Sequence, residues 1–414
     1  MSLFSIIFAT TINSTLYRQM KIGKYHIGLL PLILTAIALG IIFGNVLSED
    51  WVRVFVTFNN LFSQFLGFMV PLIIIGLVTP AIAGIGASAG RMLVATVLIA
   101  YIDTVVAGLL GYSVGSWLFP SMTASTTVYT ATQAGNLSPY FELSIPAMVD
   151  VMSALVFSFM AGMGIVYTHA TALRTLFNEF QDIIGKVIAC VIIPLLPLYI
   201  FGIFLNMTYT GQAWHILTVF AQVIVVIVVL HVLILLYEFV IAGGVCHKNP
   251  LRLLWTMIPA YLTALGTSSS AATIPVTLRQ TVKNGVSTDV AGFTVPLCAT
   301  IHMPGSMMKI TCCALTVCLL NGMPHDFGLF LHFMLLLAVC MVAGPGVPGG
   351  AVMAALGPLA SVLGFNTDMQ ALIIALYIAM DSFGTACNVT SDGAIALTID
   401  RWFRKKQTNG SREP

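Results

Sequence analysis

The sequence predicts an all-α polytopic membrane protein with eight transmembrane helices and two re-entrant helical hairpins. Of its 414 residues, 58% are hydrophobic and only 8% are charged, which is far from the composition of a soluble globular protein. The apolar runs are long and continuous, unlike the short alternating strands of a membrane β-barrel. Two breaks rich in serine, glycine or proline interrupt the apolar sequence, and such backbone survives at membrane depth only where protein or a water-filled cavity receives it.

Six continuous apolar segments precede the first break. Each is long enough to cross about 30 Å of hydrocarbon. They cover residues 25–47, 54–83, 92–119, 147–170, 183–206 and 214–241. Residues 1–24 end in several basic side chains and are interpreted as a surface helix rather than an export signal.

A hairpin and an interrupted span follow from residue 250. The hairpin, 250–281, is broken by the serine run Thr267–Ser270, and the next span, 288–320, is interrupted at His302–Ser306. Pro304 removes a backbone donor and frees a carbonyl one turn earlier. This part of the chain is therefore expected to form a helical hairpin followed by an unwound span.

The same plan then occurs a second time. A hairpin at 327–363 is broken by the glycine/proline knot Gly344–Gly350, and the last span, 368–400, is expected to unwind at Asn388–Gly393. Basic residues fall on alternate loops, so the positive-inside rule places both termini in the cytoplasm. On this topology the first hairpin enters the membrane from the cytoplasmic side and the second from the outside. We therefore expect inverted repeats, whose broken segments form the binding site in many transporters.

Two carboxylates lie inside the last span, where they are costly and usually functional. Asp381 can hold an ammonium, Asn388 can offer an amide to a carboxylate, and Asp392 beside unwound carbonyls suits a hard cation. The serine run at a half-helix tip adds N–H and hydroxyl donors, a natural seat for a carboxylate. These residues predict a site for an α-amino acid with a cation bound alongside.

Three motifs resemble the dicarboxylate/amino acid:cation symporter family of glutamate-transporter-like proteins. They are Ser268–Val276, Gly346–Gly350 and Asn388–Asp392. The resemblance covers essentially the whole chain from residue 25, and the motifs agree with the family in order, spacing and topology.

The resemblance implies a homotrimer in lipid, in which a scaffold holds a transport domain that moves like an elevator. The scaffold comprises 25–90 and 147–206, and the transport domain comprises 91–119 and 214–400 with both hairpins. Residues 401–414 form a cytoplasmic tail. The second hairpin is expected to act as the extracellular gate.

The resemblance also implies which positions contact the substrate and the coupling cations. The substrate positions are Ser269, Ser270, Ser306, Val347, Asp381, Gly384, Thr385 and Asn388. The positions that match the family's sodium sites are Thr300, Met303, Asn388 and Asp392, with sodium expected at Asp392. Tyr101, Asp103 and Thr104 lie next to positions that face the same site in the family, and His302 and Lys309 are added as candidate coupling residues from their own chemistry. By this resemblance Ser269 and Ser270 meet the α-carboxylate, and Asp381 takes the α-amino group.

Departures from the family pattern favour a neutral substrate. Members that carry acidic substrates usually have an arginine where this chain has Gly384 and a supporting carboxylate where it has Tyr377. Without a guanidinium, an acidic side chain would be buried unpaired, and Gly384 leaves volume for a neutral one. Lys309 is open to three interpretations: a partner of an acidic substrate, a built-in cation or proton carrier, or a side chain that reaches from the helix to water.

The predicted cation site also differs from the family pattern, because Pro304 occupies the position of an aspartate that binds sodium in the family. Asp103 could supply the lost carboxylate from the third span and pair with His302. The pair would indicate altered sodium coupling or proton coupling, and the alternative is a structural hydrogen bond. Glu238 is expected to be solvated near a helix end.

The sequence thus predicts a secondary active transporter of the plasma (inner) membrane that imports a small neutral α-amino acid with sodium, a proton or both. The alternative within transport is an acidic amino acid or dicarboxylate symporter that uses Lys309. A channel would be distinguished by current without concentrative uptake. No enzyme activity is expected, since Ser270 has no partner base, and neither a bound cofactor nor a nucleic-acid partner is expected.

Overall fold

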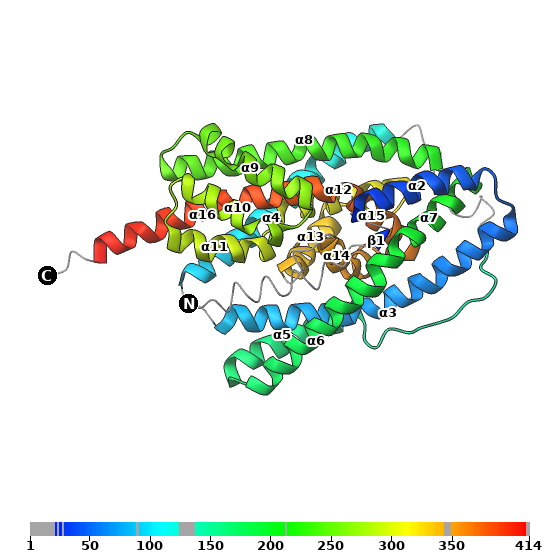
Figure 1. Ribbon diagram of the computed structural model, residues 1–414, viewed down its shortest axis with the longest axis horizontal. Helices are drawn as coiled ribbons and strands as arrows, with labels where there is room; N and C mark the ends of the chain where they lie inside the picture. The colour runs from blue at the N-terminus through cyan, green and yellow to red at the C-terminus, as the bar shows by residue number, and fades with distance from the viewer. Residues whose placement is uncertain are drawn as a thin grey trace.

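Helices account for nearly all regular structure in the computed structural model (Figure 1). It describes residues 21–22, 25–26, 29–87, 91–123, 137–211, 213–342 and 349–410. Within these residues the only strands are β1 (Lys21–Ile22) and β2 (Tyr25–His26), a short antiparallel pair. The expected helical class is confirmed for the described chain. The surface helix expected for 1–24 is replaced at its end by β1, and residues 1–20 lie outside the described residues.

Six of the described helical elements, from the N-terminal half of the chain, pack together as one group. It consists of α2 (Leu29–Gly44), α3 (Glu49–Ala87), α5 (Val151–Thr168), α6 (Thr171–Val187), the π-helical turn η1 (Ile188–Ile192) and α7 (Ile193–Tyr209). Helix α2 lies along α7, and α3 lies along α5 and α6 (Figure 1). The predicted span 183–206 is thus the continuation of a longer helical path that begins at Thr171.

A second group surrounds the C-terminal helix. It consists of α4 (Arg91–Thr123), α8 (Ala213–Cys246), α9 (Pro250–Thr267), α10 (Ser270–Lys283), α11 (Thr288–Ile301), α12 (Pro304–Leu320), α13 (Phe327–Val342), α14 (Gly350–Ser361), α15 (Thr367–Ala379) and α16 (Asp381–Gly410). Helix α12 packs along α4, and α16 packs against α8, α9, α11 and α12. Helices α14 and α15 make most of the contacts of this second group with α2, α3, α5 and α7 among the described residues, and α13 and α8 add smaller contacts with α3 and α7. The division into scaffold and transport domains stays a prediction.

The serine run breaks the first hairpin as expected. Ser268 has a left-handed backbone (φ 51°) and ends α9, and Ser269 begins α10 by accepting a hydrogen bond from Ala272 N. Serine is among the residues preferred at the N-cap, the position of Ser269, because its hydroxyl accepts a hydrogen bond from a free N–H of the helix start. The second hairpin joins α13 to α14, which begins after Gly349 with a φ of 75°. Residues 343–348, which include most of the glycine/proline knot, lie outside the described residues.

The expected interruption between α11 and α12 is confirmed at His302 and Met303, just before Pro304. The interruption expected at Asn388–Gly393 is wrong, because those residues continue α16. The last span bends instead at Met380, by 65° between α15 and α16. Since no proline lies between 388 and 393, the backbone there keeps its helical hydrogen bonds. Likewise, the expected tail 401–414 begins as helix, since α16 continues to Gly410.

Among the described residues, five helical paths are long and apolar enough to cross a membrane, and the bent pair α15–α16 adds a sixth. The five are Glu49–Gly84, Arg91–Thr123, Thr171–Tyr209, Ile216–Cys246 and Thr288–Leu320. This is the arrangement of a multi-pass membrane protein. The total of eight spans, the re-entry of the hairpins and the inverted repeats stay predictions.

Candidate functional site

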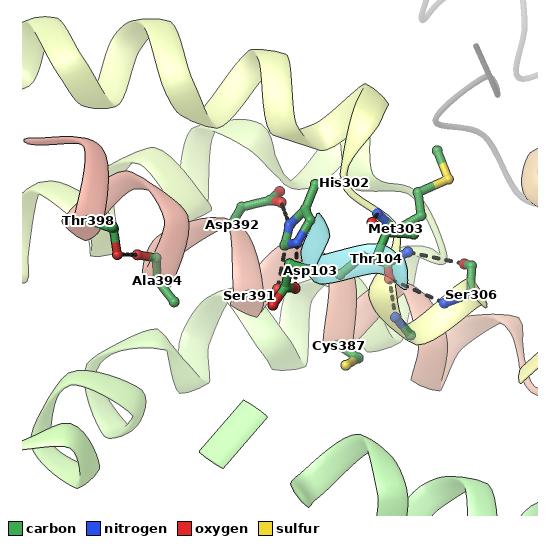
Figure 2. Close-up of polar contacts among 12 residues, drawn as sticks. Asp103, Thr104, His302, Met303, Ser306, Cys387, Ser391, Asp392, Ala394 and Thr398 are labelled. Carbon is green, nitrogen blue, oxygen red and sulfur yellow. Dashed lines mark hydrogen bonds and ion pairs between the residues drawn. The ribbon is translucent and has the colours of Figure 1, made fainter. Parts of the chain in front are cut away.

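A buried histidine joins two aspartates at the break between α11 and α12 (Figure 2). His302 Nε2 lies 2.9 Å from Asp103 Oδ2 on α4, and its Nδ1 lies 3.1 Å from Asp392 Oδ1 on α16. Ser391 Oγ lies 3.4 Å from the same Nδ1. The structure therefore brings together the expected partners Asp103 and His302 and adds Asp392 on the opposite side of the ring.

The other expected coupling positions differ in how close they come to this histidine. Thr104 Oγ1 accepts a hydrogen bond from Met303 N at 3.4 Å and so fastens the break to α4. The Tyr101 hydroxyl donates to the Leu335 carbonyl at 3.2 Å, on α13. Thr300 is exposed and donates to Leu297 O. Neither the Tyr101 hydroxyl nor the Thr300 hydroxyl is hydrogen-bonded to the His302 cluster.

Glu238 belongs to the same cluster, contrary to the expectation that it is solvated. Glu238 is only 4% exposed. One potential ligand atom from each of Asp103, Glu238 and His302 lies within 4.8 Å of the other two. The predicted span ended at 241, whereas α8 continues to Cys246, so Glu238 lies about two turns inside the helix. A correct helix end would have revealed a carboxylate at membrane depth.

A second cluster surrounds Asp381 at the start of α16. Lys309 Nζ lies 3.5 Å from Asp381 Oδ1, 3.4 Å from Met380 O and 3.7 Å from the centroid of the Tyr377 ring. Lys309 is fully buried, which contradicts the interpretation that it reaches water. Its ammonium is held by a carboxylate, a carbonyl and an aromatic face.

Gly384 provides the space for Lys309 rather than for a substrate side chain. A Cβ atom at Gly384 would lie 2.5 Å from Lys309 Nζ and 3.1 Å from its Cδ. The expectation that Gly384 leaves free volume is therefore wrong in this structure. The long lysine side chain crosses from α12 and places its amino group against the start of α16.

Asn388 holds the start of α12 through its side-chain amide. Its Oδ1 accepts hydrogen bonds from Gly305 N at 2.8 Å and Ser306 N at 3.3 Å, and its Nδ2 donates to Ser306 Oγ at 3.1 Å. Ser306 Oγ also lies 2.8 Å from the Tyr377 hydroxyl. The amide thus satisfies the free N–H groups of a helix start, and a substrate carboxylate would have to compete for it.

Both hairpin tips approach α16 near Asp381. Gly349 N donates to Asp381 Oδ2 at 2.8 Å, and Ser268 Oγ lies 2.6 Å from Ser382 Oγ. Of the other expected substrate positions, Ser269, Ser270 and Thr385 are buried. Ser269 and Ser270 begin α10 at the first tip, and Thr385 lies one turn after Asp381. Val347 lies outside the described residues.

The two clusters differ in formal charge. Asp381 and Lys309 neutralise each other, whereas Asp103, Glu238 and Asp392 surround a single imidazole. The Asp392 carboxylate fits sodium by its oxygen atoms. The carbonyl of Asn388, expected as another ligand, lies within continuous helix, so a sodium ion here would depend on carboxylates.

Comparison with known proteins gives one consistent result. Residues 29–402 match the sodium:dicarboxylate symporter family. The chain is similar to the serine/threonine transporter SstT of Acinetobacter baylyi, with 26% identity over 400 residues, 89% of this chain and 97% of that protein. It is also 29% identical over 277 residues, 64% of this chain, to excitatory amino acid transporter 1 of Rattus norvegicus and of Bos taurus, and this match spans 50% of each of those proteins.

Proposed function

Because the chain belongs to the sodium:dicarboxylate symporter family, we propose that it imports a small neutral α-amino acid together with a cation across the plasma membrane. The protein is a multi-pass membrane protein of a family of transporters and is not an enzyme. Its substrate, its coupling cation and its mode of movement are the finer parts of the proposal.

The ion pair between Lys309 and Asp381 is the main observation that favours a neutral substrate. This pair makes the buried site electrically neutral, so a zwitterion adds no net charge on binding. An extra carboxylate would leave a net negative charge away from water, at a cost of several kcal/mol. The substrate ammonium is assigned to Asp381, whose long 3.5 Å contact with Lys309 can be exchanged for a shorter one.

The substrate carboxylate is assigned to the first hairpin tip. Helix α10 begins at Ser270, and a helix start offers free N–H groups with positive dipole character. The name of the Acinetobacter relative, a serine/threonine transporter, supports a small neutral amino acid.

A second candidate substrate is an acidic amino acid or a dicarboxylate. Lys309 favours it, because the ammonium fills the space beside Gly384 and could pair with a second carboxylate. In that case Lys309 would bind the second carboxylate of the substrate, and Asp381 would bind the amino group of an acidic amino acid.

The two substrate classes are separated by uptake into proteoliposomes. We expect unlabelled serine, threonine or alanine to compete with radiolabelled serine at least tenfold more strongly than aspartate or malate, since tenfold corresponds to about 1.4 kcal/mol, less than the cost of an unpaired buried carboxylate. Uptake confined to aspartate or malate would support the second candidate instead.

The coupling cation is proposed to act at the cluster around His302, as sodium at Asp392, as a proton, or as both. The partly exposed carboxylate of Asp103 and the buried carboxylate of Asp392 flank the imidazole and provide the negative charge that a cation requires. Lys309 is assigned to the substrate cluster, because its contacts lie with Asp381 and Tyr377.

Asp103→Asn is expected to weaken the dependence of uptake on the coupling gradient. The substitution removes one of the charges that face the cation but keeps a similar shape. Uptake should be measured with sodium and proton gradients imposed separately, beside Asp289→Asn as a control on the first turn of α11. An Asp103→Asn carrier with the sodium and pH dependence of the parent would contradict a coupling role.

Movement by an elevator mechanism within a homotrimer is also proposed. Support comes from the packing of the two helix groups, which among the described elements meet mainly through α14 and α15, with smaller contacts from α13 and α8. Limited contact between two rigid groups allows one to slide past the other.

A further inference from the structure

The cluster around His302 contains more negative charge than the chain itself neutralises. Three carboxylates, those of Asp103, Glu238 and Asp392, lie beside one imidazole. No lysine or arginine among the described residues forms an ion pair with any of them. By formal charge, three carboxylates and one protonated imidazole would leave a net charge of −2 at membrane depth, where such charges are costly unless a cation or a proton neutralises them.

Glu238 is the member of the cluster whose carboxylate is least well satisfied. Both of its oxygens are buried and lie near Asp103 and Ser391, and neither makes a hydrogen bond of good geometry with the described residues. A buried polar atom without a partner costs about 1–3 kcal/mol, and more when it is charged. Its oxygens face Asp103 and His302 within 4.8 Å, so one cation could contact all three side chains.

Asp392 orients the histidine for such a role. Histidines that bind metals almost always donate their other ring N–H to a carboxylate or carbonyl, which fixes the ring and its tautomer. His302 Nδ1 can donate to Asp392 Oδ1 at 3.1 Å and so leave the lone pair of Nε2 directed at Asp103 and Glu238. Figure 2 shows the ring between Asp103 and Asp392 with a dashed contact to each.

We propose that Asp103, Glu238 and His302 form a binding site for a divalent transition-metal ion such as Zn²⁺. One nitrogen and two carboxylate oxygens are a ligand set that suits Zn²⁺ or Mn²⁺, whereas sodium has no preference for imidazole. Three protein ligands leave a fourth position for water. The ion takes the place of the hydrogen bond between His302 and Asp103, and small side-chain rotations bring the three atoms to ligand distance.

The ion would reach the site from the side of Asp103, whose side chain is 12% exposed while that of His302 is fully buried. Because the ligands come from α4, α8 and the break between α11 and α12, the ion links three separate segments. Binding to the native state alone should therefore raise thermal stability.

Direct binding tests the proposal without transport. Tag-free full-length protein in detergent is stripped with a chelator and titrated with Zn²⁺, and with Co²⁺ as a spectroscopic probe. We expect one ion per chain, a Zn²⁺-dependent rise in unfolding temperature, and the visible absorption of four-coordinate Co²⁺. No saturable binding at this stoichiometry would overturn the proposal.

Variants identify the ligands. Glu238→Gln and His302→Gln should each weaken Zn²⁺ binding by more than tenfold, and Asp392→Asn should weaken it about 10–100-fold while Co²⁺ absorption at saturation persists. Glu179→Gln, an exposed carboxylate on α6, serves as the matched control and should bind normally. Glu238→Gln keeps the size and shape of the side chain and leaves one carboxylate fewer in the cluster, so its metal-free form should fold at least as stably as the parent. Parental affinity in both Glu238→Gln and His302→Gln would exclude this site.

Discussion

Asp381→Asn is expected to lower uptake of the amino acid roughly a hundredfold, because hydrogen bonds to a charged group contribute about 1.5–3 kcal/mol and each 1.4 kcal/mol is a factor of ten. In our proposal Asp381 is the only carboxylate assigned to the substrate ammonium. Asp381 also contacts Gly349 N and Lys309, so the substitution also weakens its hydrogen bond with Gly349. Initial uptake rates into proteoliposomes measure the effect.

The loss must be separated from a loss of stability. Asp381→Asn leaves Lys309 buried without its carboxylate, and breaking a buried ion pair in this way costs about 3–5 kcal/mol. Replacing both partners, Asp381→Asn with Lys309→Met, is often close to neutral. We therefore expect the double variant to recover the unfolding temperature of the parent while uptake stays lost. Recovery of uptake together with stability would show that Asp381 serves only to balance Lys309.

The helix breaks could be predicted where the sequence itself forbids a continuous helix. Pro304 and the serine run mark real ends of helices, because a missing N–H or a local capping hydroxyl acts on its own backbone. The polar stretch Asn388–Gly393 contains no such constraint. Its side chains instead serve neighbours: Asn388 caps the start of α12, and Asp392 orients His302. Polar residues inside a membrane helix therefore have two equally good explanations: the backbone is unwound there, or the side chains bind polar groups on neighbouring helices.

The candidate site was predicted in part. Asp103 and His302 could be paired because the resemblance to a known family aligned their helices. The position of Lys309 could not be obtained that way, since a long flexible side chain can extend in several directions from α12. Only the three-dimensional packing shows that it ends against Gly384 and Tyr377. Glu238 was missed for a different reason, because helix boundaries read from sequence shift by a few residues.

Gly384→Ala is expected to reduce uptake by at least tenfold and to destabilise the protein by about 1–3 kcal/mol, the usual cost of inserting a methyl group into a packed interior. The new Cβ would lie 2.5 Å from Lys309 Nζ, so the end of this buried side chain must shift, which disturbs its contacts with Asp381 and the Tyr377 ring. Thermal unfolding and uptake of the purified variant measure the two effects.

Gly292→Ala is the matched control, because Gly292 lies within α11 and a Cβ there meets nothing within 4 Å. In a helix, alanine is favoured over glycine by about 0.5–1 kcal/mol, so this variant should be as stable as the parent or slightly more so. A double-mutant cycle then tests the cause. If Lys309 is what the methyl group displaces, Gly384→Ala should cost nothing further in a Lys309→Ala background, where the space is vacant. Equal costs in both backgrounds would mean that the lysine does not occupy the space beside Gly384, and the neutral pair on which the proposed substrate depends would no longer hold.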